Sequence, residues 1–175
     1  VETPGIGQGD AGIVAFVDLS LYVMTPEFGA ASQLEKIDML DFADVVVINK
    51  FDRPGARDAL RDVAKQVQRN RQAFAAPADD MPVFGSIASR FNDPGVTAVY
   101  RKIVDLLNAR GFDGWTCTAP AIAVKASEPG AGIIPAARRR YLAEIAETVR
   151  DYHQKVATHV GVARDRQAAR ATRRL

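Results

Sequence analysis

One run of β-branched residues constrains the fold more than any other feature of this 175-residue sequence. Residues 45–48 read Val-Val-Val-Ile, with Asp44 before them and Asn49 after them. Branched side chains favour strands, and an apolar run without polar alternation is typical of a strand covered on both faces. The run therefore predicts a central strand of a helix-covered sheet. No apolar run approaches the roughly 20 residues that span a bilayer, so we expect no membrane partner.

Shorter apolar runs and helical patterns alternate around this strand. Further strands are expected over residues 19–25, buried on both faces and stopped by Pro26, and over residues 81–84. Apolar residues recur at the spacing of helices within residues 32–40, 56–74 and 96–107. Strands that alternate with helices over short connections predict an α/β fold, a parallel sheet flanked by helices.

The pattern changes after residue 111. Residues 112–136 carry scattered Gly and Pro and predict an extended crossover, in which residues 121–125 could form one more strand. From residue 137 the pattern is helical. Its apolar residues, here named the apolar stripe, are Tyr141, Ile145, Val149, Tyr152, Val156 and Val160. A long helix with so narrow a stripe suits a linker that packs on another domain or chain.

Charge is distributed unevenly between these regions. Residues 138–175 hold ten Lys or Arg and four Asp or Glu, a net +6, whereas the earlier residues sum to −4. Basic residues can mark nucleic-acid binding. Because no aromatic residue lies among the basic residues of 161–175, we expect a solvated helix face or contacts to neighbouring domains, and no nucleic acid. One cysteine and two histidines also make a zinc cluster implausible.

The most specific motif directly follows the central strand. Asn49-Lys50-Phe51-Asp52 has the Asn-Lys-x-Asp form with which P-loop GTPases read guanine. The carboxylate of Asp52 can accept two N–H bonds from the guanine edge, and adenine offers no such pair of donors. Asn49 can bond the acceptor side of the purine, and the aliphatic stem of Lys50 can cover its face. The four letters could also arise in an ordinary turn, but their position after a buried strand favours guanine.

Two further loops fit the same kind of site. Gly85-Ser86-Ile87-Ala88 follows the next strand, where GTPases place a backbone loop against the carbonyl oxygen of the base. Residues 2–8, Glu-Thr-Pro-Gly-Ile-Gly-Gln, resemble the loop whose carboxylate reaches Mg²⁺ and whose glycine meets the γ-phosphate. The alternative is a Gly-rich surface loop without a ligand. Ligands of parallel sheets gather at the carboxyl ends of strands, so we expect these loops on one edge.

Together the motifs resemble the MeaB/ArgK branch of the P-loop GTPases. These proteins are the G-protein chaperones of adenosylcobalamin-dependent acyl-CoA mutases. The amino-acid sequence of residues 22–40 resembles that of the fused members of this branch. In these, the GTPase lies between a cobalamin-binding domain and the mutase domain. The resemblance covers essentially the whole chain and implies interconversion of isobutyryl-CoA and n-butyryl-CoA by the parent protein. We further expect a cytoplasmic protein, and the apolar stripe predicts association, most simply as a homodimer.

The resemblance carries roles to individual residues. It implies GTP binding by Asn49, Lys50, Phe51, Asp52, Ser86 and Ile87, and Mg²⁺ binding by Glu2 and Thr3. Gln8 follows the Mg²⁺ residues and is a candidate to orient water, and the other catalytic residues stay unknown. The implied cofactors are GTP and Mg²⁺, with adenosylcobalamin bound outside this segment.

One part of the GTPase pattern is missing from these residues. No G-x-x-x-x-G-K-[ST] loop, which would hold the phosphates, occurs in the sequence. We therefore expect this segment alone neither to hydrolyse GTP nor to bind it tightly. The expected parts are residues 1–111, the C-terminal part of a GTPase domain; 112–136, the crossover; and 137–175, a helical linker. A stand-alone chaperone and a non-catalytic module that binds a mutase stay open as alternatives.

Overall fold

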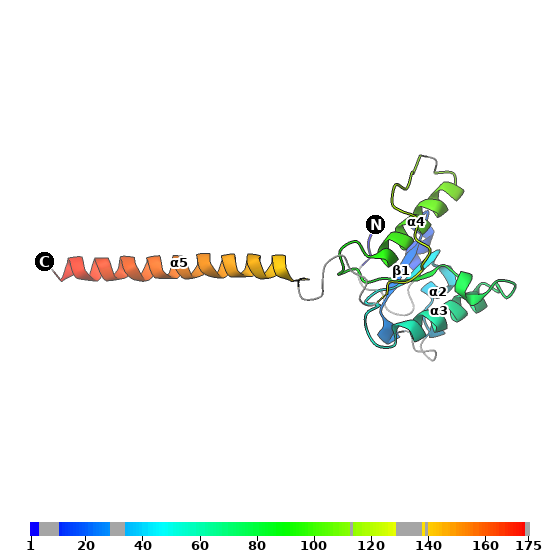
Figure 1. Ribbon diagram of the computed structural model, residues 1–175, viewed down its shortest axis with the longest axis horizontal. Helices are drawn as coiled ribbons and strands as arrows, with labels where there is room; N and C mark the ends of the chain where they lie inside the picture. Colours follow the sequence, from blue (N-terminus) through cyan, green and yellow to red (C-terminus); the bar gives the residue numbers. More distant parts are fainter. Residues whose placement is uncertain (4–10, 29–33, 113, 129–137, 139, 174–175) are drawn as a thin grey trace. The chain divides into compact units, whose positions relative to one another are not determined.

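The computed structural model describes residues 1–3, 11–28, 34–112, 114–128, 138 and 140–173 (Figure 1). The chain divides into two compact units, Val1–Ile133 and Ile134–Leu175. The first unit contains a parallel sheet with its helices, and the second contains the helix α5 (Tyr141–Thr172). No helix within the described ranges is long and apolar enough to cross a membrane.

Three parallel strands form the sheet in the order β1 (Leu21–Met24), β2 (Val45–Ile48) and β3 (Val83–Gly85). Every residue of β2 is buried, as its unbroken apolar run predicts. Since successive side chains of a strand point to opposite faces, β2 divides its residues between two cores. The prediction of an α/β fold with a parallel, helix-covered sheet is confirmed.

Helices cover both faces of this sheet (Figure 1). On one face, Val46 and Ile48 pack with the short helix α2 (Met39–Phe42) and with α3 (Ala56–Asn70). On the other face, residues of β2 and β3 pack with α4 (Pro94–Ala109). That second cluster consists of Val45, Val47, Phe84, Ala98 and Val99. Three short 3-10 helices lie in the connections: η1 (Gly12–Phe16), η2 (Pro26–Phe28) and η3 (Ala78–Asp80).

The first strand differs from its prediction. It is shorter than residues 19–25, and it is not buried on both faces, because Leu21 is 40% and Val23 54% exposed. These two residues pair with Val45 and Val47 and therefore share the face of α4. That helix packs on β2 and β3, and β1 lies at the outer edge of the sheet.

Three other local predictions need correction. The helix expected within residues 32–40 is interrupted by turns, although Leu34, Ile37 and Leu40 are all buried as its apolar spacing required. The next helix ends at Asn70, so Phe74 is not part of its apolar face and is 68% exposed. Residues 121–125 form no strand, because one parallel bridge, from Ala126 to Gly85, is the only ladder contact of the described residues there.

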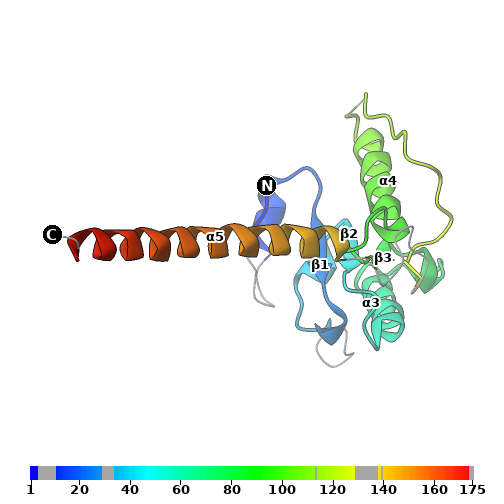
Figure 2. The same cartoon turned by 60° about the vertical axis from the view of Figure 1, so that its left-hand side comes forward.

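The chain after α4 runs back along that helix to the free edge of β3 (Figure 2). We name residues 125–128 at this edge the strap. The Gly85 N–H donates to the carbonyl of Lys125 (2.9 Å), and the Ser127 N–H donates to the carbonyl of Gly85 (3.1 Å). The Lys125 ammonium donates to the carbonyl of Met81 (2.8 Å), and partial burial lowers the pKa of Lys125. These contacts hold the strap against β3 just before the carboxyl edge.

Candidate guanine-recognition site

The 49–52 loop leaves the carboxyl end of β2 with its alternate side chains facing in and out. Phe51 is 4% exposed, and its ring lies so close to Gly85 that a Cβ there would be 2.5 Å from it. The backbone N–H of Phe51 donates to the carbonyl of Ser86 (3.0 Å). Lys50 adopts a positive φ of 57°, which costs energy for a residue with a side chain and is typical of functional loops. The buried ring thus anchors a loop whose neighbours, Lys50 and Asp52, are exposed.

Asn49 joins this loop to the loop after β3. Its Oδ1 accepts hydrogen bonds from the backbone N–H of Lys50 (2.8 Å) and of Ala88 (3.1 Å), and the Ser86 hydroxyl lies 3.4 Å away. The two loops therefore meet at one edge of the sheet, as the sequence predicts. Within the described part of the chain the carboxamide nitrogen of Asn49 has no hydrogen-bond acceptor, which leaves a donor for the acceptor side of a purine.

Asp52 offers an uncommitted acceptor. Its side chain is exposed, and no described residue donates a hydrogen bond to its carboxylate. The next residue, Arg53, forms an ion pair with Glu27 of η2. Hydrogen bonds from the side chain of Thr25, from the backbone N–H of Glu27 and from Arg53 lower the pKa of Glu27 to about 2. The charged pair therefore ties the loop after β2 to the loop after β1 beside Asp52.

The 86–88 loop presents its backbone rather than its side chains. Ser86 is 3% and Ile87 1% exposed, and their backbone N–H groups already donate to Ile48 and to Asp93, so the residue of this loop that a ligand can reach is Ala88. The N–H of Ala88 lies at an exposed position beside the carboxamide of Asn49. Ala88 belongs to the loop that the sequence predicts near the base, but the resemblance assigned GTP binding to Ser86 and Ile87 and not to Ala88, because a backbone donor requires no particular side chain.

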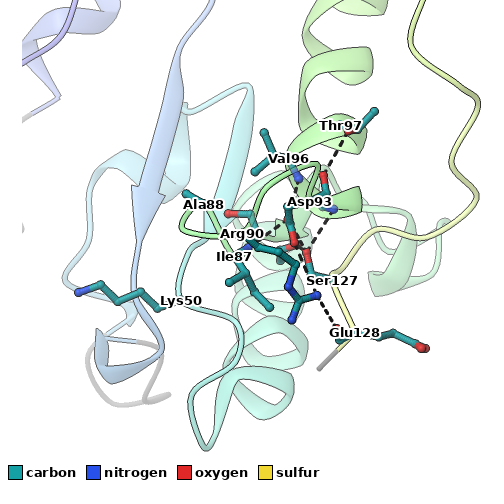
Figure 3. A network of polar contacts seen from close by, with 12 residues as sticks. Lys50, Ile87, Ala88, Arg90, Asp93, Val96, Thr97, Ser127 and Glu128 are labelled. Carbon is teal, nitrogen blue, oxygen red and sulfur yellow. Dashed lines mark hydrogen bonds and ion pairs between the residues drawn. The ribbon is translucent and has the colours of Figure 1, made fainter. Parts of the chain in front are cut away.

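A buried carboxylate stands behind this loop (Figure 3). Asp93 is 2% exposed and caps α4. Its Oδ2 accepts from the backbone N–H of Ile87 (3.1 Å), from that of Val96 (3.0 Å) and from the hydroxyl of Ser127 (2.6 Å). The sequence carries a signal for the cap alone, since Asp93 precedes Pro94 at the first helical position. The contacts to Ile87 and Ser127 are long-range and could not be read from it.

Arg90 and the strap complete the network in Figure 3. The Arg90 side chain is nearly buried, and its Nη1 donates to the carbonyl of Glu128 (2.7 Å) and lies 4.0 Å from Asp93 Oδ1. The hydroxyl of Ser127 accepts from the backbone N–H of Gly95 (3.2 Å). The strap is therefore bonded both to the loop after β3 and to the start of α4.

The residues expected on the phosphate side are less well defined. Glu2 and Thr3 are exposed, and Gln8 lies outside the described residues. No three His, Cys, Asp or Glu side chains in the described ranges lie together as a metal-binding group. Glu2 and Thr3 offer oxygen atoms, the ligands that Mg²⁺ prefers. They are too few to hold the ion alone.

Known proteins share this sequence closely. The sequence model of the methylmalonyl-CoA mutase-associated GTPase MeaB matches residues 1–78. The fused isobutyryl-CoA mutase of Cupriavidus metallidurans is 63% identical over 98% of this chain, and that of Paraburkholderia xenovorans is 59% identical over 100%. The chain is a homologue of one segment of these fused mutases. Its first 78 residues are similar to the MeaB GTPase family.

The matched segment is a small part of those relatives. It spans 16% of the length of the protein from Cupriavidus metallidurans and 14% of that from Paraburkholderia xenovorans. A third fused isobutyryl-CoA mutase, from Geobacillus kaustophilus, is 52% identical over 94% of this chain and 15% of its own length. The similarity thus extends beyond the MeaB match, through residues 79–175.

Proposed function

We propose that this chain forms the guanine-recognition part of a GTP-hydrolysing chaperone domain within an adenosylcobalamin-dependent acyl-CoA mutase. The observation that carries the proposal is the meeting of the 49–52 and 86–88 loops at the carboxyl edge of the sheet through Asn49. The MeaB match and the names of the fused relatives support the same assignment.

Each exposed group at this edge has a task toward a guanine base. Asp52 accepts the N1–H and the 2-amino group, and the carboxamide NH₂ of Asn49 donates to the acceptor side of the purine. The stem of Lys50 covers one face of the ring. Phe51, Ser86 and Ile87 are 1–4% exposed and contribute by holding the two loops in place, since the Phe51 N–H donates to the Ser86 carbonyl and the Ile87 N–H to Asp93.

The phosphate side of the site needs residues beyond those in this sequence. We propose that Glu2 and Thr3 supply oxygen ligands to Mg²⁺, and that Gln8 orients the attacking water. A bound Mg²⁺ neutralises charge on the phosphates during hydrolysis. Because no phosphate-binding loop occurs in these residues, we expect the segment alone to bind GTP weakly and not to hydrolyse it. The isomerisation of isobutyryl-CoA and n-butyryl-CoA, in the cytoplasm, would belong to adenosylcobalamin bound elsewhere in the parent protein.

A series of purine nucleotides tests this assignment in a full-length fused mutase that carries the segment. GDP should bind more tightly than IDP, which lacks the 2-amino donor to Asp52, and ADP should bind most weakly. One lost hydrogen bond to a charged group predicts about a tenfold difference between GDP and IDP. Calorimetric titration measures the three dissociation constants. Equal affinity for GDP and ADP would overturn the assignment.

The alternatives make different predictions about the rest of the chain. A stand-alone chaperone or a non-catalytic regulatory module would not need residues 79–175 to match a fused mutase. Identities of 59–63% over 98–100% of the chain favour the fused form. We therefore retain the fused form as the proposal.

The helix α5 is the proposed linker to the mutase partner, in a homodimeric protein. Residues of its apolar stripe are 39–64% exposed, a cost that packing against another surface would remove. In the full-length protein, the double substitution Ile145→Ser and Tyr152→Ser should reduce assembly or solubility, as measured by light scattering. Gln154→Ser, on the opposite side of the helix, is the matched control. Unchanged assembly of the double variant would contradict this role.

A further inference from the structure

The strap lies next to the proposed base-recognition edge. The Asn-Lys-x-Asp motif assigns the strap no role in nucleotide binding. Ser127 of the strap is 1% exposed and donates a short hydrogen bond to Asp93 (2.6 Å). The same Asp93 oxygen accepts from the backbone N–H of Ile87. Ser127 is therefore two hydrogen bonds away from the loop that faces the base.

We propose that Asp93 and Ser127 are positioning residues for recognition of the 6-oxo group of guanine, and that the strap is a working part of the nucleotide site. This inference rests on the proposed function. Asp93 fixes Ile87, and Ile87 precedes the exposed Ala88, whose N–H donates to Asn49 Oδ1 in this structure and would turn to the 6-oxo group of a bound base. Ser127 in turn holds the carboxylate of Asp93 between the loop and the start of α4.

The hydrogen bonds to Asp93 fix the position of its carboxylate relative to the 86–88 loop. Its Oδ2 has three donors, and no described residue donates a hydrogen bond to Oδ1, which lies 4.0 Å from Arg90 Nη1. Because the carboxylate of Asp93 is buried, bulk water cannot replace the hydrogen bond that the Ser127 hydroxyl donates to it. The carboxylate would then settle toward its cationic neighbour, and the N–H of Ile87 would lose its fixed acceptor.

A reciprocal effect follows from thermodynamic linkage. If the strap raises affinity for the nucleotide, nucleotide binding must stabilise the strap by the same factor. The coupling uses atoms already in contact and requires no rearrangement of the sheet.

The test compares GDP with 6-thioguanosine diphosphate in a full-length fused mutase that carries this segment. The sulfur analogue keeps the N1–H and 2-amino donors to Asp52 and replaces the 6-oxo acceptor with a weaker one. Ser127→Ala should raise the dissociation constant for GDP about tenfold, the effect of one displaced hydrogen bond, and change that for the analogue less than twofold. Thr97→Ala is the matched control, because Thr97 bonds the backbone of Asp93 and not its carboxylate.

Each other outcome has a definite meaning. Equal weakening of both nucleotides by Ser127→Ala would assign Ser127 a purely structural role and overturn the inference, and so would an unchanged affinity for GDP. No binding of GDP by the wild-type protein would overturn the proposed function and this inference with it. Hydrogen exchange gives the second measurement: GDP should slow exchange of the Ser127 amide in the wild-type protein, and unchanged exchange would contradict the linkage.

Discussion

A full-length fused mutase that carries Asp52→Asn should bind guanine nucleotides more weakly and xanthine nucleotides more tightly than the wild-type protein. The carboxylate accepts two hydrogen bonds from guanine, whereas a carboxamide presents one acceptor and one donor. Xanthine carries an N1–H and a 2-oxo group in these positions and so matches the carboxamide. Affinity for GDP should fall about 100-fold, because one contact becomes an unmatched donor facing a donor. Affinity for XDP should rise over that of the wild-type protein.

The structure favours a clean result from this substitution. Asp52 is exposed, and no described residue donates to its carboxylate, so the change breaks no internal contact. The buried ring of Phe51 keeps the loop in place. Asp58→Asn on α3 is the matched control: it removes the same charge from a side chain that is 71% exposed and pairs with Arg61. Titration of each variant with GDP and XDP measures the effect, and an equal loss of both nucleotides would refute it.

The central part of the fold could be predicted because its signals are local. Residues 45–48 are apolar at every position, and the structure buries all of them in the middle strand. The polar loops follow the strands directly, so the topology of a parallel sheet alone brings them to one edge. For the same reason the meeting of Asn49 with Ala88 follows from chain order.

The parts that could not be predicted depend on contacts between distant residues. Ser127 and Asp93 are 34 residues apart, and no periodicity indicates which hydroxyl will reach a buried carboxylate. Burial of Arg90 is unexpected for an arginine in a loop, and it depends on a carbonyl of the strap. Leu21 and Val23 are apolar, like the residues of a buried strand. They are nevertheless exposed, because α4 packs on β2 and β3.

The helix α5 marks a different limit. The spacing of its apolar residues predicts both the helix and the side that seeks a partner. This spacing does not identify the surface on which the apolar stripe packs, since the same stripe suits a second copy of the chain or a neighbouring domain equally well.

Gly95→Ala should destabilise the first unit by about 3 kcal/mol, the range of a severe overpacking substitution. In an ordinary helix this change is favourable by up to about 1 kcal/mol. Here a Cβ on Gly95 would lie 2.0 Å from the carbonyl oxygen of Gly85 and 2.5 Å from Ser127 Oγ. The oxygen belongs to the backbone of β3 and cannot rotate away, so α4 or the strap must move.

A second glycine separates this clash from helix propensity. Gly161→Ala in α5 meets nothing within 4 Å and should stabilise that helix by about 0.5–1 kcal/mol. Urea denaturation of the 175-residue chain, followed by fluorescence of Trp115 in the first unit, should report a large loss for Gly95→Ala and none for Gly161→Ala. If Gly95→Ala were neutral, α4 could withdraw from β3 at little cost. The close approach of helix, strand and strap would then not be what holds Asp93 behind the base-recognition loop.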